Sequence, residues 1–126
     1  MVSFPDQITD ELDALVQRVQ RSLVTVQNGG RGVGAGVIWR HNGVILTNNH
    51  VVQRRRPQVG LPDGHTFSAE LIDQDPEVDL ALLKVDAQDL PTALVADSRS
   101  LRIGELVIAV GHPWGQRGVV TAGVIS

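Results

Sequence analysis

Two residues of the chain, His50 and Asp79, have the types and the surroundings that acid–base chemistry requires. His50 interrupts an apolar run, VILTNNHVV at 44–52, in which a core strand would gain nothing from three consecutive polar side chains. Asp79 opens a second apolar run, DLALLKV at 79–85, where a partly buried carboxylate needs a hydrogen-bond donor. The Nδ1–H of a histidine is such a donor, and the carboxylate then leaves Nε2 free to act as a base. We predict that the two residues contact each other. Considered separately, His50 could also be an ordinary polar residue in a turn, and Asp79 an ordinary polar residue at the start of a strand.

Three other patterns predict weaker chemistry. Residues 30–35 fit G-x-G-x-x-A, but a dinucleotide site needs a helix to open there, and a hairpin pattern follows instead. The four histidines, His41, His50, His65 and His112, have no histidine or suitable acid at metal-ligand spacing, and two of them fall in predicted turns. We therefore expect no metal and no organic cofactor. The arginines at 54–56 lack interleaved aromatic residues and predict a solvated loop.

Length and composition favour one ordinary globular domain. The chain has 126 residues, 42% of them hydrophobic, a net charge of −3 and no cysteine, so a disulfide framework and a thiolate site are excluded. The charge balance predicts neither a nucleic-acid partner nor a membrane partner. The first twelve residues, MVSFPDQITDEL, lack the pattern of a secretion signal, which leaves the bacterial envelope and the cytoplasm both open as compartments.

The elements that must position His50 and Asp79 are mostly strands. One helix is expected near the N-terminus, capped by Thr9 and carrying an apolar stripe of Leu12, Leu15, Val16, Val19 and Leu23. Short strands are expected near 22–28, 33–40, 43–48, 57–61, 65–73, 80–85, 105–111 and 118–125. Hairpin spacing without intervening helices favours an antiparallel barrel or sandwich with a core of Val, Leu, Ile and Ala. Gly32, Gly34 and Gly36 alternate on one strand, where they allow a sharp bend or a close approach.

Several stretches together resemble one family. GAGVIWRHNGVILTNNHVV, DPEVDLALLKV and GELVIAVGHPWG followed by GVVTAGVIS are similar, in order, to the N-terminal half of HtrA (Deg) trypsin-like serine proteases. The resemblance implies that His50 is the general base and Asp79 its orienting acid. It implies an all-β fold, a six-stranded antiparallel trypsin-like β-barrel, the first of two, preceded by one N-terminal α-helix. The domains would be 1–21 for the helix and lead-in, 22–115 for the barrel, and 116–126 for a linker and the opening strand of a second barrel.

The same resemblance implies partners, and the chain departs from the family in one respect. HtrA-like enzymes act on peptides or unfolded proteins in protein quality control, form homo-oligomers and often carry a PDZ domain. Their nucleophile lies in a G-N-S-G-G-P segment, which is absent here, and none of the six serines is flanked by glycines. We therefore predict no nucleophile in this chain and no peptide cleavage by the chain alone.

Three interpretations remain open from the sequence. The chain is the His/Asp portion of a serine endopeptidase, a natural single-barrel binding or scaffold protein derived from a protease, or an unrelated barrel. If it is a portion, the apolar strand 118–126 lacks its neighbours, which predicts edge pairing and dimerisation.

Overall fold

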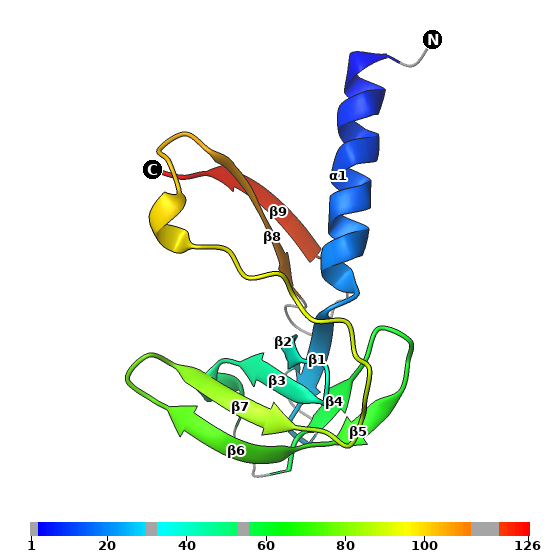
Figure 1. Cartoon of the computed structure of the whole chain (residues 1–126), viewed down its shortest axis with the longest axis vertical. Helices are drawn as coiled ribbons and strands as arrows, with labels where there is room; N and C mark the ends of the chain where they lie inside the picture. Colours follow the sequence, from blue (N-terminus) through cyan, green and yellow to red (C-terminus); the bar gives the residue numbers. More distant parts are fainter. Residues whose placement is uncertain (1–2, 30–32, 53–55, 112–118) are drawn as a thin grey trace.

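The computed structural model describes residues 3–29, 33–52, 56–111 and 119–126 of the chain. A helix stands beside a two-stranded hairpin, and both project from a curled sheet (Figure 1). The elements are α1 (Phe4–Gln20), β1 (Leu23–Gln27), β2 (Val33–Arg40), β3 (Val44–Thr47), the 3₁₀ turn η1 (Asn49–Val51), β4 (Gln58–Gly60), β5 (Thr66–Ser68), β6 (Glu70–Asp75), β7 (Leu80–Lys84), the 3₁₀ turn η2 (Ser98–Ser100), β8 (Leu106–Gly111) and β9 (Val119–Val124).

The helix begins earlier than the sequence predicts. Ser3 is the N-cap residue and its hydroxyl accepts from the N–H of Asp6, while Pro5 occupies the first turn, where proline is tolerated. Thr9 lies inside the helix, and its hydroxyl donates to the Pro5 carbonyl. The predicted cap at Thr9 is therefore wrong, because Ser3 with Pro5 starts the helix six residues earlier. Leu23, assigned to the helical stripe, belongs to β1.

Six of the predicted strands up to residue 85 form one antiparallel sheet, with the order β5-β4-β1-β2-β3-β7-β6. The strand predicted at 65–73 divides into β5 and β6 at the buried Ala69, whose N–H donates to the carbonyl of Pro57. One bent strand thus pairs with β4 through its first half and with β7 through its second half. The seven strands therefore correspond to the six predicted ones, because β5 and β6 are two halves of one bent strand. The two edges of the curled sheet meet at Ala69.

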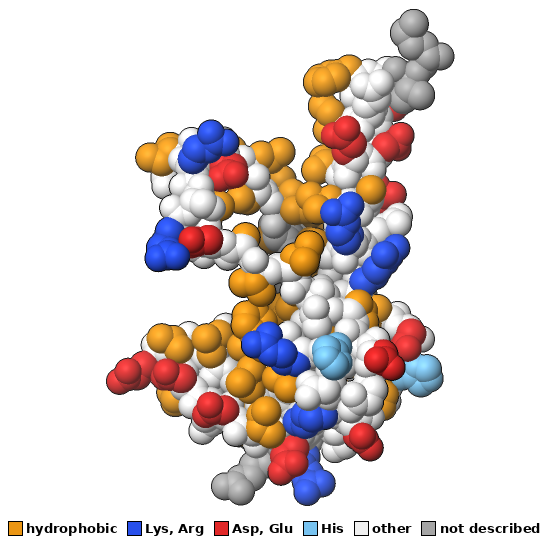
Figure 2. Space-filling model, viewed as in Figure 1, with side chains coloured by type: hydrophobic (Ala, Val, Ile, Leu, Met, Phe, Trp, Pro, Cys, Tyr) orange, Lys and Arg blue, Asp and Glu red, His pale blue; other side chains and the backbone are white. Residues whose placement is uncertain are grey.

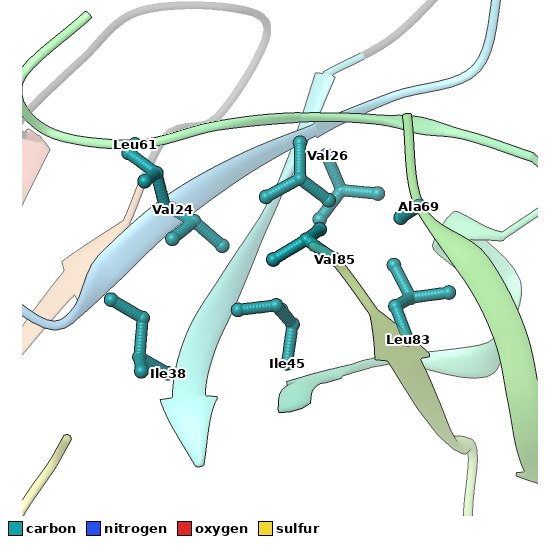
Figure 3. Packing of buried hydrophobic residues seen from close by; sticks show 9 residues of the cluster. Val24, Val26, Ile38, Ile45, Leu61, Ala69, Leu83 and Val85 are labelled. Atoms are coloured by element: carbon teal, nitrogen blue, oxygen red, sulfur yellow. The ribbon is translucent and has the colours of Figure 1, made fainter. Parts of the chain in front are cut away.

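The core lies inside the curl of the sheet (Figure 3). Its side chains come from alternate positions along the strands, as expected when one face of a strand is buried. The buried cluster consists of Val24, Val26, Ile38, Ile45, Val59, Leu61, Ala69, Leu83 and Val85. The predicted aliphatic core is confirmed, with Phe67 packed at its margin.

Glycine allows neighbouring side chains to approach β2 closely at two of the three predicted positions. A Cβ atom on Gly34 would lie 2.4 Å from Val51 Cγ1, and one on Gly36 would lie 3.0 Å from Ile45 and Val24. Gly32 falls outside the described residues. In the hairpin between β2 and β3, Gly43 has a φ of +101°, and its carbonyl accepts from Val85 N–H. This turn confirms the hairpin pattern that was predicted to follow residues 30–35.

The strands β8 and β9 form their own two-stranded sheet beside α1. They pair over six residues each, from Leu106 opposite Val124 to Gly111 opposite Val119. The expectation that strand 118–126 lacks a neighbour is therefore wrong, since β8 is its partner. The predicted domain boundary at 115 lies outside the described residues, and the division stays a prediction.

Apolar side chains gather on the hairpin and on the side of α1 that faces it (Figure 2). The exposed hydrophobic residues of these elements are Phe4, Ile8, Leu12, Leu15, Val19, Leu106, Val107, Val120 and Val124. No residue of α1 is buried, so the helix lies on the outside of the fold. Across the described part of the chain, no helix is long and apolar enough to cross a bilayer.

Candidate functional site: a histidine–aspartate pair at the end of two strands

His50 lies on η1, the short turn that follows β3. The strand ends at Thr47, whose buried hydroxyl donates to the Ala35 carbonyl at 2.8 Å, and the chain then leaves the sheet. The run of apolar residues breaks at 48–50 because these residues form the turn, not a strand. Val51 returns toward the sheet and packs on Gly34, and its carbonyl accepts from the side-chain amide of Asn28. The turn that carries His50 is thereby held against β1 and β2.

Asp79 lies in the turn between β6 and β7, directly before Leu80. Its φ is +56°, in the left-handed region that few residues other than glycine adopt and that aspartate tolerates better than most. Its backbone carbonyl accepts two hydrogen bonds from the other turn, from Asn49 N–H at 3.1 Å and from Asn48 Nδ2 at 3.0 Å. Backbone and side-chain bonds together dock the two turns.

The two carboxylate oxygens of Asp79 both engage His50. Oδ1 accepts from the backbone N–H of His50 at 2.8 Å, and Oδ2 lies 2.6 Å from Nδ1 of the ring. The structure thus brings together the two residues that the sequence analysis paired, across 29 positions of sequence. This contact makes Nδ1 the nitrogen that carries the proton in the neutral ring, because Asp79 is an acceptor there.

The pair is open to solvent. The His50 side chain is 72% exposed and that of Asp79 is 43% exposed, so the Asp79 carboxylate is partly covered, as expected, and still accessible to water. The hydrogen bond from the backbone N–H of His50, followed by that from its ring, holds the pKa of Asp79 below its ordinary value. Asp79 therefore stays ionised at neutral pH, as an acid that orients a base must.

A second histidine–aspartate pair was missed by the sequence analysis. His65 donates its backbone N–H to Asp63 Oδ1 at 2.9 Å, and its ring Nδ1 lies 2.8 Å from Asp63 Oδ2. The statement that no histidine has a suitable acid at metal-ligand spacing in the sequence is therefore wrong for His65, because Asp63 lies two residues before it and bonds it. The overlooked pattern is Asp-Gly-His, in which an aspartate side chain bonds the backbone two residues ahead in a turn.

The remaining predicted patterns add little to the site. Within the described ranges, no group of three or more His, Asp or Glu side chains could hold a metal ion. Residues 33–40 form a strand, which is incompatible with the helix that a dinucleotide fingerprint needs. His112 and most of the arginine run lie outside the described residues.

A base of this kind needs a hydroxyl to activate. All six serines are described, and the hydrogen bonds of His50 in the described chain go to Asp79. The hydroxyls of Ser22 and Ser100 donate to carbonyls three residues before them, and Ser22 is buried. By itself, the arrangement can hold an imidazole ring whose Nε2 is able to accept a proton.

The comparisons with known proteins agree with this architecture. Residues 34–126 match the family described as the trypsin-like peptidase domain. The chain belongs to that family. It is 44% identical over 102 residues to a probable periplasmic serine endoprotease, DegP-like, of Marinomonas sp. (strain MWYL1), covering 79% of this chain and 22% of that protein. It is 43% identical over 95 residues to serine protease HTRA1 of Xenopus laevis, covering 74% of this chain and 21% of that protein.

A solved structure shows the same fold for this member of the trypsin-like family. The crystal structure of the serine endoprotease from Yersinia pestis matches with a TM-score of 0.82 at 36% identity, over 90% of this chain and 43% of that one. The predicted trypsin-like β-barrel with one helix and the resemblance to the HtrA (Deg) group are both confirmed. The chain spans about a fifth of the length of the curated relatives that it matches.

Proposed function

We propose that this trypsin-like domain supplies the general base, His50, and the orienting acid, Asp79, for peptide-bond hydrolysis by a serine endopeptidase. The observation that carries the proposal is the double contact of the Asp79 carboxylate with the backbone N–H and the ring of His50. With Nδ1 engaged by the acid, Nε2 would be the nitrogen that accepts the proton of a serine hydroxyl.

The nucleophile and the oxyanion-hole donors would have to come from outside the 126 residues. Removal of one partner from such a group abolishes most of the covalent catalysis, because the members act as a unit. We therefore infer that the chain alone does not cleave peptides. A peptide or unfolded-protein substrate is proposed by analogy with the serine endoproteases that the chain resembles.

The test uses an exchanged protein, in which this chain replaces the matching segment of the Yersinia pestis endoprotease. Its peptide hydrolysis and its labelling by a fluorophosphonate are measured. The exchanged protein should be active, and His50→Ala should lower kcat by about 10⁶-fold. His65→Ala is the matched control, because it removes a histidine with the same contacts to an aspartate, and it should leave the rate unchanged. The chain alone should not be labelled.

Two results would overturn the proposal. One is an exchanged protein whose hydrolysis survives His50→Ala. The other is labelling of the purified 126-residue chain above its own His50→Ala control, which would mean that a serine within the chain is the nucleophile.

A non-catalytic binding or scaffold role is the second candidate, and the exposed apolar residues of the β8–β9 hairpin favour it. Leu106 and Val124 are 65% and 62% exposed, and an apolar hairpin of this kind is a surface for association. We propose that the chain forms a homo-oligomer through the hairpin. Sedimentation at rising concentration should show association that Val120→Lys weakens; a monomer at all concentrations would contradict this.

A further inference from the structure

Asn48 has an unusual relation to the turn that it precedes. It is the N-cap residue of η1, with φ −82° and ψ 145°, a place where an asparagine side chain ordinarily accepts from a backbone N–H in the first turn. The side chain of Asn48 makes no such bond. Its Nδ2 instead donates to the backbone carbonyl of Asp79, 31 residues later, at 3.0 Å.

The cap that Asn48 does not provide comes from Asp79. Oδ1 of Asp79 accepts from the backbone N–H of His50, the second residue of η1, at 2.8 Å. Asn48 and Asp79 have therefore exchanged roles. The aspartate caps the turn from the β6–β7 side, and the asparagine binds the aspartate in return.

The exchange matters because Asp79 has a φ of +56°. A residue in this region persists there only when its surroundings hold it. The donors that reach its carbonyl are the side chain of Asn48 and the N–H of Asn49, both from the turn that carries His50. These bonds fix the orientation of the Asp79 carbonyl group. The side-chain carboxylate of the same residue bonds both the backbone N–H and the ring of His50.

We propose that Asn48 is a positioning residue, whose side-chain amide holds Asp79 in the left-handed conformation from which its carboxylate reaches both the backbone and the ring of His50. The proposal rests on the proposed function for its catalytic meaning, whereas the geometry that it predicts does not depend on proteolysis. It also gives a reason for a polar residue at the point where the apolar run at 44–52 breaks.

The test uses two variants of the whole chain, Asn48→Ala and Asn48→Asp. Both remove the amide donor, but aspartate is among the best N-cap residues and can cap the N–H of His50 itself. Asn48→Asp therefore retains a capped turn while it loses the bond to Asp79 and places a second carboxylate beside it. A residue that only stabilised the turn would be replaced well by aspartate, and a residue that positions Asp79 would not.

The readouts are the ¹⁵N shifts of the neutral His50 ring, which report its tautomer, and the titration of the Asp79 carboxyl by ¹³C NMR. In both variants we expect the His50 ring to lose its preference for the Nδ1–H tautomer and the pKa of Asp79 to rise toward its ordinary value. His65 and Asp63 form the same contacts without Asn48 and serve as the internal reference in each sample. Their signals should not change.

Two outcomes would overturn the proposal. An unchanged His50 tautomer and Asp79 titration in both variants would mean that Asn48 does not position the acid. Changes of equal size at His65 and Asp63 would mean that the substitution acts on the whole fold. The two proposals can fail separately. If the exchanged protein does not hydrolyse peptides but the Asn48 variants of this chain still change the His50 tautomer, the proposed function is wrong and this inference stands.

Discussion

The described residues include two histidine–aspartate pairs with nearly the same internal geometry. In the His50–Asp79 pair, the carboxylate oxygens lie 2.8 Å from the backbone nitrogen and 2.6 Å from ring Nδ1. In the Asp63–His65 pair, the corresponding distances are 2.9 Å and 2.8 Å. Both histidine side chains are highly exposed, at 72% and 74%. The contact between the two side chains therefore does not by itself distinguish a candidate catalytic pair from an ordinary turn.

The difference lies in what holds each pair. Asp63 and His65 are two residues apart, and the turn between them forms locally. His50 and Asp79 come from two turns that meet only because β3 pairs with β7, with Thr47 opposite Ala81. The long-range pair needs the whole sheet, whereas the local pair needs only three residues.

The two turns also differ in their packing. The turn of His50 is held by Val51 against Gly34, where an added Cβ would lie 2.4 Å from a valine methyl. The turn of His65 has open space around Gly64, with no heavy atom within 4 Å of an added Cβ. A catalytic base has to be held in place before substrate arrives, and of these two histidines His50 has the surroundings that would do so.

The largest difference is expected in catalysis by the exchanged protein. Asp79→Asn should lower kcat by about 10⁴-fold, because the amide can donate to Nδ1 and favour the wrong tautomer of His50. Asp63→Asn makes the same change in the local pair and should leave kcat unchanged. Steady-state kinetics with one peptide substrate measures both, and equal effects of the two substitutions would remove the distinction between the pairs.

A smaller difference is expected in stability and local structure. Gly34→Ala forces Val51 to move and should cost about 1–3 kcal/mol of unfolding free energy, as overpacking does. Its NMR shift changes should centre on His50 and leave His65 unchanged. Gly64→Ala, at a φ of +94°, should cost about 1–2 kcal/mol and change His65 only. Urea unfolding and amide spectra test this, and a Gly34→Ala variant with unaltered His50 resonances would contradict the packing argument.

The smallest difference concerns the dependence of stability on pH. The pKa of Asp79 is lowered chiefly by the backbone N–H of His50, and that of Asp63 chiefly by the ring of His65. A carboxylate whose pKa is lower in the folded state stabilises the fold above its ordinary pKa of 3.8, and that contribution is lost as the pH falls through the folded value. Since both groups are exposed, the contribution is small and is screened by salt.

Asp79→Asn should therefore destabilise the chain slightly at neutral pH, and its difference from the unsubstituted chain should vanish in strong acid. Urea midpoints measured from neutral pH to below the ordinary carboxyl pKa test the sign. A difference that grows as the pH falls would contradict it.

Much of the fold follows from local patterns in the sequence. Period-two apolar runs and glycine-containing turns predicted the strands, because a strand with one buried face must alternate. His50 and Asp79 could be paired because His50 interrupts one apolar run and Asp79 opens another, so that each is a polar residue at the margin of a predicted strand. Ser3 with Pro5 could also have been recognised as the helix start, since both carry known N-terminal preferences.

The remainder depends on tertiary contacts that no short pattern contains. The bend at Ala69, which lets one strand pair at both ends of the sheet, requires the curl of the whole sheet. The left-handed conformation of Asp79 and its bonds to Asn48 and Asn49 exist only where two distant turns meet. The Asp63–His65 pair is the opposite case, because it lies in a local Asp-Gly-His turn that the sequence alone contains, with the aspartate bonded to the backbone two residues ahead.

The most direct measurement is the tautomer of the His50 ring in the whole chain, from ¹⁵N NMR at a pH where its imidazole is neutral. We predict that the proton resides on Nδ1, donated to Asp79, with Nε2 unprotonated and available to accept a proton from a serine. A ring that carries its proton on Nε2 would contradict this prediction, because Nε2 would then have no lone pair with which to accept a proton from a serine.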